Sequence, residues 1–240
     1  MIKRVSFCYI LFAASHPAIS QEINATQKNF SIELGESRVI FNENSKLASL
    51  TVINPQSYPV LIQTSSINED KKNTGSYVIT PTLLRLESNQ RSKLTVRIIN
   101  PKGMPYDRES MEWICVKAIP PKDNEDDSSS QSSLKVQVQL SLNTCNKIFY
   151  RPKSISVATD KFYSNLGWKK DGNNLTAVNN SPLYINFHEV RLNNLPIAGF
   201  EYIPPYSERT VKISSSDKGE IQWAVINDTG GTSTTFKKVL

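Results

Sequence analysis

Apolar and polar residues alternate without interruption along residues 134–142, at the start of the stretch LKVQVQLSLNTCNKIFYRP (134–152). A period of two places successive side chains on opposite faces of a β-strand. The aliphatic face of this predicted strand consists of Leu134, Val136, Val138, Leu140 and Leu142. Such a strand belongs either to the protein's own core or to an edge that a partner protein covers. The alternation alone favours the core.

Shorter strand-like segments follow one another along the rest of the chain, separated by turns rich in Gly, Pro, Asn and Ser. They lie at 29–34, 38–41, 46–53, 60–64, 77–81, 83–86, 92–100, 111–119, 155–157, 174–179, 183–192, 209–214 and 220–227. No segment has the period of an amphipathic helix. Strands spaced by about ten residues are typical of β-sandwiches. The pattern therefore predicts an all-β protein.

Pro152 separates these segments into two groups, each long enough to form a sandwich core. We predict a first domain at 21–151 and a second at 152–240. Before the long alternating strand lies KDNEDDSSSQSS (122–133), an acidic and serine-rich segment with nothing to bury. This composition indicates a flexible loop.

Residues 1–20 have the pattern of a secretory signal peptide. A basic start with Lys3 and Arg4 precedes an apolar run at 5–14, and Ala18-Ile19-Ser20 forms a small-x-small cleavage site. The apolar run is too short to cross a bilayer, and no other stretch approaches the necessary length. We therefore expect a soluble, exported mature protein without membrane insertion.

Export changes the interpretation of the cysteines. Cys8 lies within the predicted signal peptide, so the mature chain keeps Cys115 and Cys145. Two cysteines in an oxidising compartment indicate one disulfide rather than a metal site. Two reduced, buried thiols are the alternative.

The sequence gives no support for catalysis. The mature chain has a lone histidine, His188, in an apolar run, and its main acidic cluster lies in the predicted loop 122–133. Metal sites need several ligands at suitable spacing, and Gly230-Gly231 lacks the context of a phosphate-binding loop. The net charge of +6 is spread along the chain, whereas nucleic-acid binding favours a clustered basic face. We expect no enzyme activity, metal, cofactor or nucleic acid.

The faces of the 134–152 stretch leave one question open. Lys147 has the same parity as Cys145, whereas Leu142 has the opposite parity. A bulge near Asn143 and Thr144 would bring Lys147 onto the aliphatic face. Without a bulge, Lys147 points away from that face.

Five motifs occur in a fixed order along the mature chain. They are SRVIF at 37–41, YDRES at 106–110 followed by Pro120-Pro121, KIFYRP at 147–152, PYSE at 205–208 and INDTGG at 226–231. Together they resemble the periplasmic pilus-assembly chaperones. The leading proline of the second motif is displaced to Pro105. The resemblance implies two immunoglobulin-like β-sandwich domains arranged at an angle, with a cleft between them.

The resemblance also assigns roles to residues. It implies that Arg38 and Lys147 lie in the cleft and bind the terminal carboxylate of a fibre subunit. The aliphatic row at 134–142 would fill the groove of an incomplete subunit sandwich by β-augmentation. An interdomain ion network would hold the two domains at a fixed angle. Its members are Glu109, Arg151 and Asp228.

The cysteines refine the resemblance. A Cys115–Cys145 disulfide joining the last two strands of the first domain, with a long loop between them, resembles the long-loop branch of the family. That branch serves thin, non-rod surface fibres. In it, Phe30, Ile32 and Leu34 would add a second strand to the subunit contact.

The resemblance implies a periplasmic chaperone that binds fimbrial subunits and delivers them to an outer-membrane usher. The free form is also a candidate for self-association, because a long apolar edge strand is an aggregation hazard. A fimbrial subunit or adhesin is the main alternative, and an exported β-sandwich hydrolase is the second.

Overall fold

A computed structural model of the chain describes residues 31–99, 101–121, 140–155, 160–214 and 219–240. These residues are mostly in β-strands and surround two large hydrophobic cores. The first core takes its residues from the chain between Ile32 and Tyr150, and the second from the chain between Ile155 and Val225. Each core lies between two sheets, so the all-β, two-sandwich prediction is confirmed.

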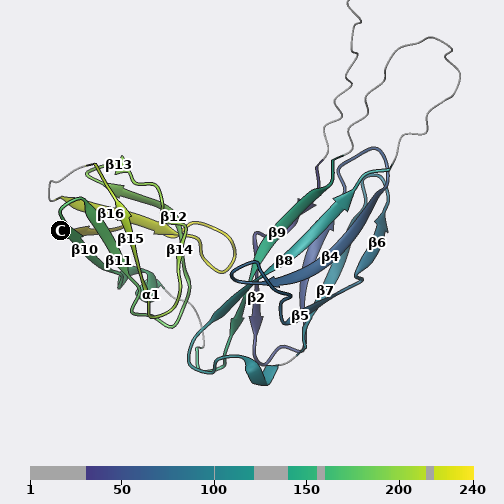
Figure 1. Cartoon of the computed structure of the whole chain (residues 1–240), viewed down its shortest axis with the longest axis horizontal. Coiled ribbons are helices and arrows are strands. Elements are labelled where there is room, and N and C mark those ends of the chain that lie inside the picture. Colours follow the sequence, from purple (N-terminus) through teal and green to yellow (C-terminus); the bar gives the residue numbers. More distant parts are fainter. Residues whose placement is uncertain (1–30, 100, 122–139, 156–159, 215–218) are drawn as a thin grey trace, which may run out of the picture. The chain divides into compact units, whose positions relative to one another are not determined.

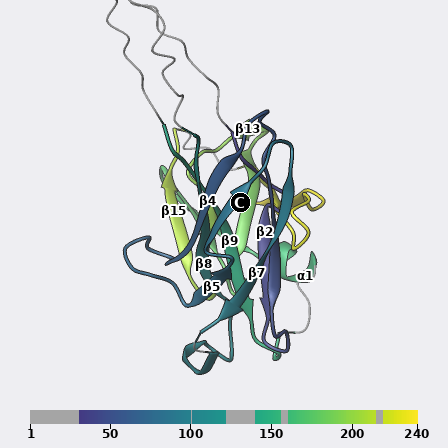
Figure 2. The same cartoon turned by 90° about the vertical axis from the view of Figure 1, so that its right-hand side faces the viewer.

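The first sandwich consists of a four-stranded and a five-stranded sheet. The four-stranded sheet has the order β1 (Glu33–Leu34), β3 (Ala48–Ile53), β7 (Arg91–Ile98) and β5 (Tyr77–Thr80). The five-stranded sheet has the order β2 (Arg38–Asn42), β9 (Leu142–Arg151), β8 (Ser110–Ile119), β4 (Val60–Asn68) and β6 (Leu83–Leu86). A short 3₁₀ turn, η1 (Pro101–Gly103), precedes β8. The long strands β4, β8 and β9 run side by side in both views (Figure 1, Figure 2).

Binary patterning explains how these strands face each other. Along β4, Val60 and Ile62 are buried whereas Leu61 and Gln63 are exposed, as expected for a sheet with one face on the core. On the opposing sheet, Leu50 and Leu94, which are paired across β3 and β7, are fully buried.

The second sandwich has a three-stranded sheet and a five-stranded sheet. The first contains β10 (Gly167–Asp171), β11 (Asn174–Val178) and β15 (Glu208–Lys212). The second contains β13 (Leu195–Pro196), β12 (Ile185–Leu192), β16 (Glu220–Val225), β17 (Phe236–Val239) and β14 (Tyr202–Ile203), which pairs with β12. The short helix α1 (Asp160–Ser164) precedes β10. The core of the second sandwich is rich in aromatic side chains: Trp168 packs against Phe187, Phe200 and Trp223.

Several elements of the second sandwich were not predicted from the sequence. β10, β13, β14, β17 and α1 are two to five residues long. Segments this short contain too few apolar positions to establish a period. The predicted strand at 155–157 is wrong at Ile155, which lies in a bend and donates its backbone N–H to the Pro152 carbonyl oxygen. Residues 156–157 lie outside the described residues.

The last strand of the first sandwich continues beyond Leu142, where the predicted strand ends. The structure has β9 at Leu142–Arg151, whereas Leu140 and Ser141 precede the strand. The other residues of the predicted 134–142 strand lie outside the described part of the chain, as do Phe30, the 122–133 loop and the predicted signal peptide.

β9 pairs with β8 without a break in register, from Leu142 opposite Ala118 to Tyr150 opposite Ser110. No bulge separates Leu142 from Lys147, so the two side chains lie on opposite faces of the strand. The open question of their parity is therefore decided by the structure: Lys147 points away from the aliphatic face.

The expected disulfide is present. Cys115 on β8 and Cys145 on β9 lie directly opposite each other, with a Cα–Cα distance of 4.0 Å. The bridge closes a loop over a sequence separation of 30 residues.

Replacing both cysteines (Cys115→Ser with Cys145→Ser) should lower the free energy of unfolding by about 3–4 kcal/mol, because a loop of this length regains conformational entropy in the unfolded chain. Urea unfolding of both proteins at pH 7 measures the difference. Two alkylatable thiols in the unreduced wild-type protein, detected by mass spectrometry, would contradict the disulfide itself.

Candidate functional site

The outer face of β9 joins the two sandwiches. Ile148 and Tyr150 belong to the core of the first sandwich, whereas Phe149 belongs to a small separate cluster with Met111 and Tyr184. Tyr184 directly precedes β12 of the second sandwich, and its ring centroid is 5.6 Å from that of Phe149. Alternate residues of one strand therefore serve the core and the contact between the sandwiches.

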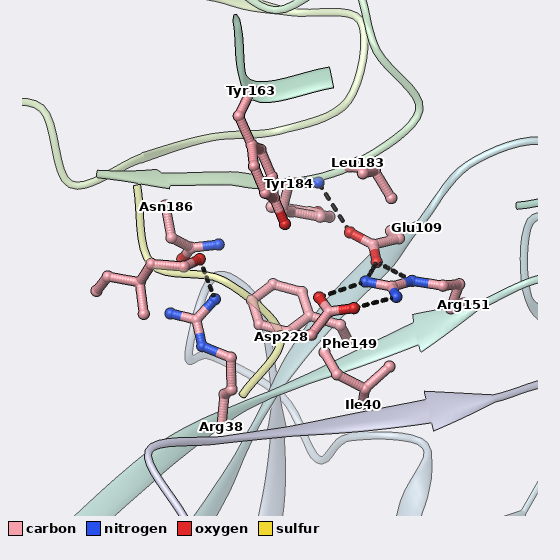
Figure 3. A pocket seen from close by; sticks show the side chains of 11 residues that line it. Arg38, Ile40, Glu109, Phe149, Arg151, Tyr163, Leu183, Tyr184, Asn186 and Asp228 are labelled. Atoms are coloured by element: carbon pink, nitrogen blue, oxygen red, sulfur yellow. Dashed lines mark hydrogen bonds and ion pairs between the residues drawn. The ribbon is translucent and has the colours of Figure 1, made fainter. Parts of the chain in front are cut away.

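A buried ion network adjoins this cluster (Figure 3). The Arg151 guanidinium donates from Nε to Glu109 Oε1 at 2.7 Å, and from Nη2 to Asp228 Oδ1 at 2.8 Å. Arg151 and Glu109 are only 5% and 4% exposed. The second oxygen of Glu109 accepts a hydrogen bond from the backbone N–H of Tyr184 at 2.9 Å. The structure thus brings together all three residues that the resemblance implied for an ion network.

Local structure explains how each member of the network is positioned. Ser110 pairs with Tyr150 across β8 and β9, so the residues just beyond them, Glu109 and Arg151, become neighbours. Asp228 lies in a tight turn in which Asn227 Oδ1 accepts the backbone N–H groups of Thr229 and Gly231. Side-chain capping of this kind fixes the turn and aims Asp228 at the guanidinium.

The positive charge of Arg151 and the negative charges of Glu109 and Asp228 stabilise one another. Burial alone lowers the pKa of Arg151, but the hydrogen bonds and charges of Asp228 and Glu109 outweigh it and raise that pKa above its usual value. Burial raises the pKa of Glu109, and the charge of Arg151 opposes that rise. A buried ion is tolerated only while its partner is present.

Arg38 and Lys147 lie side by side. They are partners in the parallel pairing of β2 with β9, and both side chains reach oxygen atoms of the second sandwich. Arg38 Nη1 donates to the Ile226 carbonyl oxygen at 3.1 Å (Figure 3), and Lys147 Nζ donates to Asn186 Oδ1 at 2.8 Å. The Ile226 N–H in turn donates to the Asn186 carbonyl oxygen at 2.8 Å.

Both cations are poorly compensated. Burial lowers the pKa of Arg38, and burial together with the charge of Arg38 lowers the pKa of Lys147 to about 8. The Nε atom of Arg38 is buried and has no hydrogen-bond partner among the described residues. The acceptors that hold the two side chains, an amide oxygen and a carbonyl oxygen, are neutral. The pair is therefore suited to an anionic ligand such as a carboxylate.

Aromatic rings surround the ammonium group. Lys147 Nζ lies 4.5 Å from the ring centroid of Tyr202 and 5.7 Å from that of Trp113. Cation–π contact compensates part of the lost hydration of the charge.

An open strand edge begins next to Lys147. β2 pairs with β9 only from Lys147 onwards, so among the described strands none pairs with residues 142–146 on that side. The side-chain amide of Asn146 donates to the Glu36 carbonyl oxygen and covers one end of this edge.

Two members of the aliphatic row are described: Leu140, just before this edge, is 72% exposed, and Leu142, the first residue of the edge, is 38% exposed. Because Ala118 is buried, its partner Leu142 lies on the face of β9 that continues the core of the sandwich.

Sequence reasoning missed the residues of the second sandwich that complete the site. Asn186 is 3% exposed, within the apolar run of β12. A polar residue in such a run was the available signal. Tyr163 and Tyr184 line the same pocket as Arg38 (Figure 3). Their partners are distant in sequence, so no periodicity pointed to them.

The described residues offer no further catalytic or metal-binding group at this site. His188 is exposed where the pairing of β12 with β16 shifts register. Among the described residues there is no group of three or more His, Cys, Asp or Glu side chains that could hold a metal ion. No helix in the described part of the chain is long and apolar enough to cross a membrane.

Comparison with protein-family models gives two adjacent matches. The N-terminal domain of the pili and flagellar-assembly chaperone PapD matches residues 31–156. The C-terminal domain of the pili assembly chaperone PapD matches residues 161–237.

Individual proteins match over nearly the whole chain. The chaperone AggD of Escherichia coli is 35% identical over 99% of this chain and 96% of its own. The chaperone PsaB of Yersinia pestis is 36% identical over 96% of this chain and 93% of its own. A chain in the solved structure of the Salmonella enterica SafA pilin in complex with the SafB chaperone has a TM-score of 0.83 and 37% identity, covering 91% of this chain and all (100%) of that chain.

The Arg151→Ala variant should lower the free energy of unfolding by about 3–5 kcal/mol, because it leaves the Glu109 carboxylate buried without a counter-charge. Arg191→Ala is the matched control: Arg191 pairs with Glu189 at 2.9 Å but is 44% exposed, so its loss should cost less than about 1 kcal/mol. Urea unfolding measures both. Equal effects would contradict the importance of the buried network.

Proposed function

The chain belongs to the pili assembly chaperone family, and from that membership we propose that it binds fimbrial subunits by lending them the edge of its β9 strand. Members of this family are chaperones and not enzymes.

The observation that carries the proposal is the open edge of β9 beside two under-compensated cations. An incomplete subunit sandwich could add its strands along 134–146 by β-augmentation, in which main-chain hydrogen bonds supply the pairing. The aliphatic row of Leu134, Val136, Val138, Leu140 and Leu142 would supply the anchors. Each buried Val or Leu contributes about 1.5–3 kcal/mol, so the row is worth on the order of 10 kcal/mol before ordering costs.

Arg38 and Lys147 would bind the terminal carboxylate of the subunit. An alternating strand fixes register only to a multiple of two residues, and an end-group anchor removes that ambiguity. Leu142 and Lys147 lie on opposite faces of β9, which supports separate roles for the aliphatic row in filling the groove and for Lys147 in binding the carboxylate. The anchors face the subunit groove, whereas Lys147 faces the second sandwich.

The ion network of Glu109, Arg151 and Asp228 would keep the second sandwich in place beside the anchor. Asn186 and Ile226, which hold the two cations in the free protein, belong to that sandwich. A loose joint would let Asn186 and Ile226 move away from the two cations, which would then lose the oxygen atoms that orient them.

The cellular context is part of the proposal. The predicted signal peptide at 1–20 and the family support a periplasmic location, where the chaperone would pass subunits to an outer-membrane usher. The SafA–SafB complex, a pilin bound to its chaperone, supports fimbrial subunits as partners. These relatives favour the chaperone function over the alternatives of a subunit or a hydrolase.

Either Arg38→Ala or Lys147→Ala should weaken the binding of a carboxylate-ended subunit by about 30-fold or more, the usual cost of truncating one partner of a charged pair. The probe is a synthetic peptide that copies the last strand of a fimbrial subunit, titrated with purified chaperone. Lys169→Ala, a change at an exposed lysine of β10, is the control. Wild-type affinity in both cleft variants would contradict the anchor.

The same titration should depend on pH. The Lys147 pKa of about 8 lies below the usual 10.5, and a bound carboxylate favours the protonated form. Affinity should therefore be constant below about pH 8 and fall as the pH rises through that value, by up to tenfold per unit. An amidated peptide should bind more weakly and lose this dependence, and identical profiles for both peptides would exclude a carboxylate contact.

A charge in the aliphatic row should block complex formation. We expect Leu140→Glu to abolish co-purification with a co-expressed fimbrial subunit, because the carboxylate would have to enter an apolar groove. Leu83→Glu, on the edge strand β6, is the matched control, since Leu83 is also exposed (58%). An unaltered yield of complex with Leu140→Glu would refute the role of the row.

A further inference from the structure

Asn186 is a buried amide that lies against both cations of the site. It is only 3% exposed, and its Oδ1 accepts a hydrogen bond from Lys147 Nζ at 2.8 Å. Its backbone is held on both sides, because its carbonyl oxygen accepts the Ile226 N–H at 2.8 Å and the residue pairs with Tyr202 of β14. The side chain therefore projects from a fixed point on β12.

The contact with Lys147 decides how the amide is turned. An ammonium group only donates hydrogen bonds, so the oxygen of the amide must face it. The nitrogen of the amide then points the other way, into the pocket that Asn186 lines together with Arg38 (Figure 3). Nδ2 has no hydrogen-bond partner among the described residues. A buried amide with two unused N–H groups is the kind of donor that a ligand satisfies.

Arg38 brings further donors to the same pocket. Its Nη1 donates to the Ile226 carbonyl oxygen at 3.1 Å, while its Nε is buried without a partner among the described residues. The two acids that line the pocket, Glu109 and Asp228, are bound to Arg151 instead. The pocket thus holds unused donors of Arg38 and Asn186, a combination suited to an acceptor.

The size of the pocket restricts what can enter. Its volume is about 10 Å³, which is room for one group of the size of a water molecule. One oxygen atom of a carboxylate fits this space, whereas a side chain does not.

We propose that Asn186 is a specificity-determining residue, which donates from Nδ2 to the carboxylate of the subunit beside Arg38. Lys147 gains a second role, since it holds the amide in the donating orientation. The inference rests on the proposed function for its ligand. A carboxylate can only accept, so both of its oxygens suit these donors, whereas a carboxamide would turn its own N–H groups towards one of them.

NMR of the full-length protein with labelled asparagine side chains tests the contact directly. The probe is a synthetic peptide that copies the last strand of a fimbrial subunit, with a free or an amidated end. The free carboxylate should shift one Nδ2 proton of Asn186 downfield in a saturable way, and the amidated peptide should not. Identical shifts of this proton with both peptides, or no shift with either, would overturn the proposal.

The isosteric variant Asn186→Asp keeps an acceptor for Lys147 and removes the donor. It should weaken binding of the free-carboxylate peptide at least about tenfold, the cost of one hydrogen bond to a charged group. It should bind the amidated peptide more tightly than the wild type does, because the amide end can donate to the new carboxylate. Charge repulsion at a distance would leave that neutral peptide unaffected, so unchanged binding of it would contradict a direct contact. Asn174→Asp, at an exposed position of β11, is the matched control and should change neither affinity.

Acetate examines the site without a subunit. It should shift the same Nδ2 proton, and acetamide should not. If amidation leaves the binding of the peptide to the wild type unchanged, the proposed function fails. The acetate titration then decides the role of Asn186 by itself: a shift supports it, and the absence of a shift overturns it.

Discussion

The buried guanidinium of Arg151 is the interaction on which the arrangement of the site depends. A charge that is only 5% exposed needs counter-charges, and it receives them from Glu109 before β8 and from Asp228 in the second sandwich. Arg151 is also the last residue of β9, four residues beyond Lys147. The pairing that stabilises this charge therefore places the second sandwich next to the two cations of the site.

A single strand combines these functions because its two faces are independent. Ile148 and Tyr150 fill the first core, while Lys147, Phe149 and Arg151 face the second sandwich. Since the register is unbroken, the face that carries Leu142 continues the core beyond the end of β2. A partner that completes its own sandwich there would pair with a strand whose other half is rigidly held.

The electrostatics of the site follow from partial burial. Arg38 and Lys147 are held by neutral oxygens of Ile226 and Asn186, so they are oriented without being neutralised. Burial lowers the pKa of both side chains, and the charge of Arg38 lowers the pKa of Lys147 further. Such a site gains more from an incoming anion than a solvated pair would, because the cost of dehydrating the cations is already part of the folded state.

The sequence by itself determined that the protein is all-β, where most of the longer strands lie and which two cysteines remain for a disulfide. Its motifs also contained Arg38, Lys147, Glu109, Arg151 and Asp228. Alternation, however, reports only which side chains share a face. Only the tertiary structure decided that Leu142 and Lys147 lie on opposite faces, because that depends on the register of β9 with β8. It alone supplied Asn186 and Tyr184, because residues up to 75 positions apart meet through packing rather than through any local pattern.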